Sequence, residues 1–161
     1  MKRIFLLMML CAVCLCLFGR GAAQEPDPAA PETIPFETIL TGWHANGIVE
    51  RTALIINDDD GFLSVWEMIV RGDFPTPTAP SIDFETTTVI FVSSGVMPSG
   101  GYDVAIERIV AVDGGLEVHV LMLEPPEDAA VTAALTQPYH GVILSKTDLP
   151  VEFRWETRES W

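Results

Sequence analysis

Residues 86–93 read Thr-Thr-Thr-Val-Ile-Phe-Val-Ser, a run dominated by β-branched and aromatic side chains. Such side chains lose rotamer freedom in a helix and pack well on the pleated surface of a sheet. The second half of the run is apolar at consecutive positions, which is typical of a strand covered on both faces. We therefore expect residues 86–93 to form a central strand.

Further strands are predicted on both sides of this run. Apolar side chains recur at every second position of residues 102–106 and 116–122, as expected of strands with one buried face. Asp113-Gly114-Gly115 between them predicts a hairpin turn. The other predicted strands cover residues 36–41, 47–56, 141–146 and 150–156.

One segment has a helical period instead. Phe62, Val65, Trp66 and Ile69 are spaced so that they share one helix face, after the acidic run 58–60 and before Gly72. The predicted fold class is therefore α+β. It is mainly antiparallel β, a sandwich or an open barrel-like sheet of about seven strands, with one amphipathic helix.

The first 23 residues have the features of a secretory signal peptide. Met1-Lys2-Arg3 is basic, residues 4–18 are almost all apolar, and Gly21-Ala22-Ala23 offers small residues for a signal peptidase. The apolar run is short for a membrane span, which needs about 20 residues. All three cysteines of the chain lie in this segment, so cleavage would leave none. Lipid attachment is the alternative, but Leu10, Val13 and Leu15 precede the cysteines where small residues are usual, so membrane anchoring is not expected.

Residues 24–35 are rich in proline and acidic side chains and predict an extended tether, which leaves residues 36–157 as the domain. Removal of the signal would leave six basic residues against 23 acidic ones, a formal charge of −17. Such a charge repels nucleic acid and anionic lipid, so neither is an expected partner. We expect an exported protein, periplasmic or extracellular.

The sequence contains neither a Gly-x-Ser-x-Gly elbow nor a His-Glu-x-x-His zinc motif. His44, His119 and His140 have no metal-ligand spacing. A weak calcium candidate starts at Ile56, with Asp58, Asp60, Ser64 and Glu67 at ligand positions of a calcium loop, but Ile56 stands where the first aspartate is required. The alternative is that Asp58 or Asp59 caps the helix. No cofactor is predicted.

One loop and its neighbours resemble a known family. Residues 95–102 read Gly-Val-Met-Pro-Ser-Gly-Gly-Tyr between two predicted strands, and residues 136–139 read Thr-Gln-Pro-Tyr before the last strands. This pattern resembles the PrcB C-terminal domain family over roughly residues 36–153. Ser99 stands where threonine is more usual.

The resemblance implies an exported bacterial protein that is not an enzyme and that binds or stabilises a partner protein. The expected partner is a secreted or surface protease, because the name-giving member supports a surface subtilisin-like protease. The partner-binding residues implied are Pro98, Ser99, Gly100, Gly101, Tyr102, Gln137, Pro138 and Tyr139.

Two alternatives remain open. The loops at Pro98–Tyr102, Asp113–Gly115 and Gln137–Tyr139 follow the order of the three inhibitory loops of chagasin-type peptidase inhibitors, which predicts that they gather at one end of a β-sandwich. A hydrolase with an unrecognised site is the second alternative. Trp43, in a predicted loop, is a further contact candidate because tryptophan is favoured at interfaces.

Overall fold

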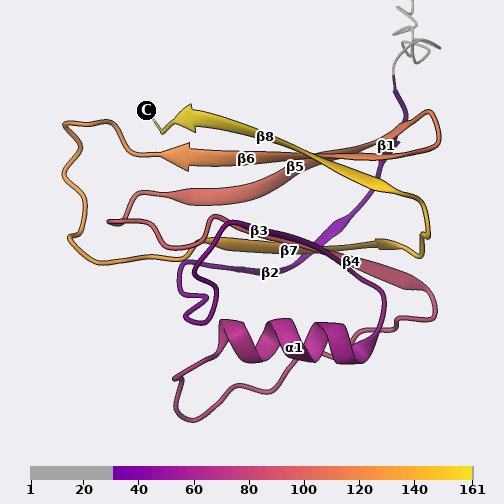
Figure 1. The fold of residues 1–161 in the computed structure, drawn as a ribbon, viewed down its shortest axis with the longest axis horizontal. Coiled ribbons are helices and arrows are strands. Elements are labelled where there is room, and N and C mark those ends of the chain that lie inside the picture. Colours follow the sequence, from indigo (N-terminus) through magenta and orange to yellow (C-terminus); the bar gives the residue numbers. More distant parts are fainter. Residues whose placement is uncertain (1–30, 161) are drawn as a thin grey trace, which may run out of the picture. The chain divides into compact units, whose positions relative to one another are not determined.

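The computed structural model describes residues 31–160 and contains two four-stranded sheets and one helix (Figure 1). Sheet A has the strand order β1-β5-β6-β8, and sheet B has the order β2-β7-β4-β3. The elements are β1 (Thr33–Ile34), β2 (Glu37–Gly42), β3 (Thr52–Ile56), α1 (Asp59–Ile69), β4 (Thr87–Ser93), β5 (Asp103–Val112), β6 (Gly115–Glu124), β7 (Tyr139–Ser145) and β8 (Val151–Glu159). The predicted α+β class, mainly antiparallel with one helix, is confirmed. The predicted signal peptide, residues 1–23, and the first part of the predicted tether lie outside the described residues.

The two sheets and the helix form three layers around β4. Ile90 and Val92 of β4 pack into the core between the sheets, whereas Val89 and Phe91 pack into a second core beneath α1. All four side chains are fully buried. The predicted central strand is confirmed, because β4 lies between β7 and β3 and is covered on both faces.

Helix α1 begins and ends where the sequence predicts. Asp58 is its N-cap, since one carboxylate oxygen accepts a hydrogen bond from the Gly61 N–H at 2.8 Å. Phe62, Val65 and Ile69 form its buried face. Gly72 follows the helix with a φ of +90°, a conformation that glycine adopts more easily than other residues.

Three features of the strand topology were not predicted. β1 lies within the segment predicted as a tether and pairs with β5. β2 and β3, consecutive in the chain, are at opposite edges of sheet B. β8 pairs in parallel with β6, while every other strand pair is antiparallel in the part of the chain that the structure describes. β8 also extends to Glu159, two residues past the predicted domain boundary.

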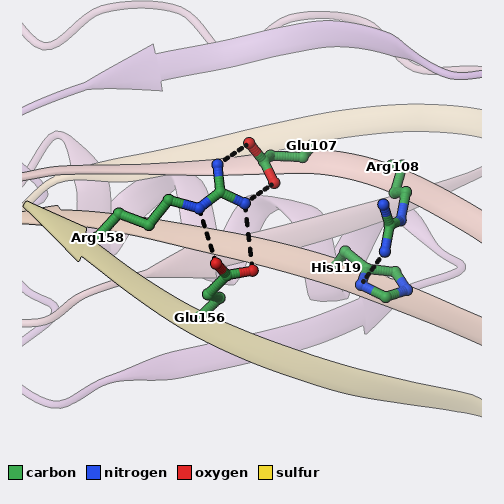
Figure 2. Close-up of polar contacts among 5 residues, drawn as sticks. All are labelled: Glu107, Arg108, His119, Glu156 and Arg158. Atoms are coloured by element: carbon green, nitrogen blue, oxygen red, sulfur yellow. Dashed lines mark hydrogen bonds and ion pairs between the residues drawn. The ribbon is translucent and has the colours of Figure 1, made fainter.

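The outer face of sheet A carries alternating charges. Arg158 on β8 forms paired hydrogen bonds with Glu107 on β5 and with Glu156 on its own strand (Figure 2). Arg154 donates one hydrogen bond to Glu117 and one to Glu152, at 2.8 Å each. These contacts lower the pKa of Glu156 and of Glu117, chiefly through the hydrogen bond from the neighbouring arginine. Exposed ion pairs add little stability, so their main effect is to keep this face polar.

Over residues 31–160, no helix has both the length and the apolar character that a membrane crossing requires.

Candidate functional site

The loops at residues 96–102 and 136–139 are joined by main-chain hydrogen bonds. The Met97 N–H donates to the Thr136 carbonyl at 2.7 Å, and the Thr136 N–H donates back to the Met97 carbonyl at 3.1 Å. The hydroxyl of the buried Thr136 donates to the Ser99 carbonyl at 2.8 Å. The structure therefore brings the two segments together into one surface.

A third segment, the connection between β2 and β3, joins the same surface. The Gln137 N–H donates to the Trp43 carbonyl at 2.7 Å, and the Gln137 carbonyl accepts from Ala45 at 3.2 Å. The Val96 N–H donates to the Val49 carbonyl at 3.0 Å. Figure 1 shows the three connections at the same end of the sandwich. We call this surface the loop end and define it as residues 42–50, 95–102 and 131–139.

The carboxyl half of the predicted site supports the loop end from inside. Pro138 is fully buried, and its carbonyl accepts hydrogen bonds from Ser93 and Ser94. The half-buried ring of Tyr139 stacks on Phe91, with ring centroids 6.0 Å apart. Burial, with a smaller contribution from Asp73, raises the pKa of the Tyr139 hydroxyl. Both side chains therefore pack beneath the loops and help to hold them in place.

The amino half of the predicted site sets the path of the backbone. Gly100 approaches Thr132 so closely that a Cβ atom would overlap the threonine hydroxyl. Gly101 has a φ of +88°, which disfavours any residue with a side chain. Pro98 is exposed at the tip, and Ser99 and Tyr102 are half-buried. Among these residues, Pro98 is therefore the one whose side chain is most accessible.

The most exposed apolar side chains of the loop end were largely missed by the sequence reasoning. The exposed fractions are 57% for Trp43, 67% for Val49, 40% for Val131 and 63% for Leu135. Of these, only Trp43 was predicted as a contact candidate. Val131 and Leu135 lie in residues 127–136, which read as a polar excursion, and no pattern there indicates which side chains face solvent. Exposed apolar groups on adjacent segments are typical of protein contact surfaces.

The chagasin-like arrangement is wrong. Asp113–Gly115 forms the turn between β5 and β6, whereas the loop at 96–102 precedes β5. Ten residues of extended β5 separate the two, and Figure 1 shows the β5–β6 turn at the end of the sandwich away from the loop end. The three loops cannot enter one cleft together, because the turn at Asp113–Gly115 lies at the opposite end of the sandwich from the other two.

The calcium candidates lie along α1. Asp58 uses one oxygen to cap the helix, and the Ser64 hydroxyl donates to the Asp60 carbonyl. Because a helix rises about 1.5 Å per residue, Asp60 and Glu67 are separated by about 10 Å along the axis. Within residues 31–160, no three His, Cys, Asp or Glu side chains are grouped as metal ligands.

The three histidines lie in different structural settings. His44 is exposed on the loop end. His119 lies on the outer face of sheet A, 2.8 Å from Glu117 and 3.1 Å from Arg108, and Figure 2 shows the contact with Arg108. His140 is buried, and its Nδ1 accepts a hydrogen bond from the Ile106 N–H at 3.0 Å. The neutral ring therefore carries its proton on Nε2, which lies 2.9 Å from the Thr38 hydroxyl. In this tautomer His140 cannot take a proton from Thr38.

Comparison with known proteins gives one family. Residues 88–145 match the family model described as PrcB C-terminal, so the resemblance expected from the sequence is confirmed for this part of the chain. The matched range runs from β4 to β7 and includes both predicted loops. No curated protein and no solved structure matches the chain.

Proposed function

We propose that this protein is an exported, non-catalytic domain that binds a partner protein, a secreted or surface protease, through the loop end. The observation that carries the proposal is the set of exposed apolar side chains Trp43, Val49, Val131 and Leu135 on segments that are hydrogen-bonded to one another. The match to the PrcB C-terminal family supports a role in protein interaction.

The loop end is suited to binding because its backbone is already ordered. Three connections are held by main-chain hydrogen bonds, and Tyr139 and Pro138 fill the space beneath them. Ordering a loop on binding costs conformational entropy, so a surface fixed in advance keeps more of its contact energy. Trp43 would supply the largest apolar contact, and tryptophan is among the residues that contribute most at interfaces.

A catalytic role has less support. Among the described residues, the Thr38 hydroxyl lies beside the imidazole of His140. Because Nδ1 of His140 accepts from the Ile106 N–H, its proton is on Nε2 and faces the hydroxyl. His119 is paired with Glu117 and Arg108 on an open sheet face. Neither His140 nor His119 is thus in position to act as the base that a hydrolase needs to activate its nucleophile.

The test is capture of an exported protease by the purified protein, followed by direct binding of the purified pair. We expect Trp43→Ala to weaken binding at least about tenfold, because central aromatic residues often contribute 2 kcal/mol or more. Leu149→Ala is the matched control, since Leu149 is 50% exposed but lies between β7 and β8, outside the loop end.

Equal binding by the wild type, Trp43→Ala and Leu135→Ala would contradict the use of the loop end. The captured protein could instead be one that is not a protease. If Trp43→Ala abolished its capture, the result would support the loop end as the binding surface but would exclude a protease as the partner. Hydrolysis of a substrate by the purified protein, abolished by Thr38→Val, would favour the hydrolase instead.

A further inference from the structure

The four sheet edges of the described chain differ in how they are protected against pairing. Exposed edge strands readily add another strand, and proteins usually prevent this with short strands, charged side chains or bulges. β1 has only two residues, β2 has an irregular register between Thr38 and Leu40, and β8 carries Glu152, Arg154, Glu156 and Arg158. β3 reads Thr-Ala-Leu-Ile-Ile and has none of these features.

The outer backbone of β3 has no main-chain partner among the described residues. β3 is the last strand of sheet B, and its residues pair only with β4 in a regular register from Thr52 to Ile56. Ile55 is 40% exposed on this strand. In an antiparallel edge strand the N–H and C=O groups of alternate residues point outward, away from β4, and these groups are available to an extended peptide.

A groove runs along this same edge, between β3 and α1. Its volume is about 340 Å³, and its strand side is lined by Leu54, Ile55 and Ile56. Successive side chains of a strand point to opposite faces, so three consecutive residues can line one groove only along the strand edge. Figure 1 shows α1 running back along the sheet after β3.

The helix side of the groove is shaped to leave room for side chains. It is lined by Gly61, Ser64, Val65 and Met68, which fall on one face of α1. Gly61 and Ser64 are small and lie toward the start of the helix, while Val65 and Met68 are apolar. An incoming strand would thus meet backbone groups on one side and a shallow, mostly apolar wall on the other.

Charge favours one orientation of the occupant. Asp58 lines the groove at the start of α1, and the exposed Asp59 and Asp60 follow it in the chain. Lys146 lies near this end, since its Nζ donates to the Asn57 carbonyl at 2.9 Å, so one positive charge accompanies three negative ones. The remaining negative charge complements a basic side chain at this end of a bound peptide.

We propose that the groove between β3 and α1 binds an extended segment of a partner polypeptide by strand addition to β3. The segment would run antiparallel to β3, like the other strand pairs of sheet B. It would carry Lys or Arg at its amino end, near Asp58–Asp60, and apolar residues at alternate positions after it. The groove shares no lining residue with the loop end, although the two adjoin where the Gly47 N–H donates to the Met68 carbonyl at 2.8 Å. The proposal does not rest on the function proposed above.

The experiment uses the purified protein and the pentapeptide Arg-Thr-Val-Thr-Val, which matches β3 in length. Amide chemical shifts and hydrogen exchange locate the bound peptide on the protein. We expect shifts and new protection at β3 and along the groove side of α1. Exchanging the peptide arginine for glutamate should weaken binding, and N-methylation of one alternate set of peptide amides should abolish it, because those N–H groups pair with β3.

Two helix variants separate the groove from the rest of α1. Ser64→Phe fills the groove and should lower peptide affinity at least about tenfold, a change of about 1.4 kcal/mol. Leu63→Phe adds an aromatic ring to a neighbouring exposed position that does not line the groove, and should bind as the wild type does. Trp43→Ala should also leave peptide binding unchanged, which separates this test from that of the loop end.

Several results would overturn the proposal. These are no peptide binding, shifts confined to β8 or the loop end, and equal affinity of the wild type and a folded Ser64→Phe. A dimer that Ser64→Phe dissociates would assign the edge to a second copy of the chain. Protection in the monomer, before peptide is added, of the outward β3 amides that are not bonded to β4 would assign the groove to a segment of the chain itself.

Discussion

Single residues at the centre of the molecule explain features that the sequence pattern leaves unassigned. His140 lies on β7 but accepts from the Ile106 N–H of β5, so it links the two sheets. Burial lowers the pKa of the His140 imidazole, and the carboxylate of Asp103 opposes this only in part. Nothing in the sequence distinguishes His140 from His44, because burial depends on the packing of strands that are distant in the chain.

Stability should therefore depend on pH through His140. The folded pKa is lowered from 6.5, so between the two values the unfolded chain binds more protons. The free energy of unfolding should be highest above pH 6.5 and should fall as the pH decreases from 6.5 toward the folded pKa. Urea denaturation between about pH 7.5 and 5.5 measures this effect before most carboxylates titrate.

His140→Gln is the control for this dependence. Glutamine can accept from Ile106 and donate to Thr38 but does not titrate, so the variant should lose the decrease in this pH range. A parallel decrease in both proteins would assign the effect to other groups.

At the scale of elements, the local sequence pattern predicted a helix or strand correctly where the element could be recognised from its own residues. The acidic run 58–60 and the spacing of Phe62, Val65 and Ile69 predicted α1, and the apolar run 86–93 predicted β4. β1 was missed because two residues between prolines carry no period. The parallel neighbour of β6 was also missed, since a strand's partner depends on the packing of segments far apart in the chain.

The cap of α1 gives a prediction at this scale. Asp58→Ala should lower the free energy of unfolding by about 0.5–2 kcal/mol, because the Gly61 N–H loses its acceptor. Asp58→Ser keeps an acceptor and should recover most of this loss. Urea denaturation of the three proteins measures the difference, and an equal loss in the serine variant would show that capping is not the cause.

For the whole molecule, the family resemblance indicated two loops that the structure brings together, but it did not indicate which side chains around them are exposed. The loops at 96–102 and 136–139 do meet, but Pro138 and Tyr139 face inward, and the exposed apolar groups come largely from residues 42–50 and 131–135. Solvent exposure is a property of the complete fold. Sequence alone could indicate Trp43 as a candidate, but it could not select Val131 or Leu135.

The overall charge gives a further prediction for partner binding. The chain has a formal charge of −14, so it would attract a basic partner surface electrostatically. Added salt shortens the range of this attraction. The association rate with the partner should fall as ionic strength rises from about 0.05 to 0.5 M, where the screening length drops several-fold. Trp43→Ala should mainly raise the dissociation rate, and stopped-flow or surface binding kinetics separate the two effects. An association rate independent of salt would exclude electrostatic steering.

The parallel pairing of β8 with β6 determines where a tag can be attached without disturbing the loop end. β8 runs toward the same end as β6, and the Ser160 N–H donates to the Glu124 carbonyl there. Glu32, in contrast, bonds Ala111 beside the β5–β6 turn, at the other end of the sandwich. A bead, dye or fusion partner joined before Pro31 would therefore leave the loop end open, whereas one joined after Ser160 would crowd it. The affinity for the partner should be lower when the attachment follows Ser160 than when it precedes Pro31, so the amino-terminal attachment should be used to measure binding at the loop end.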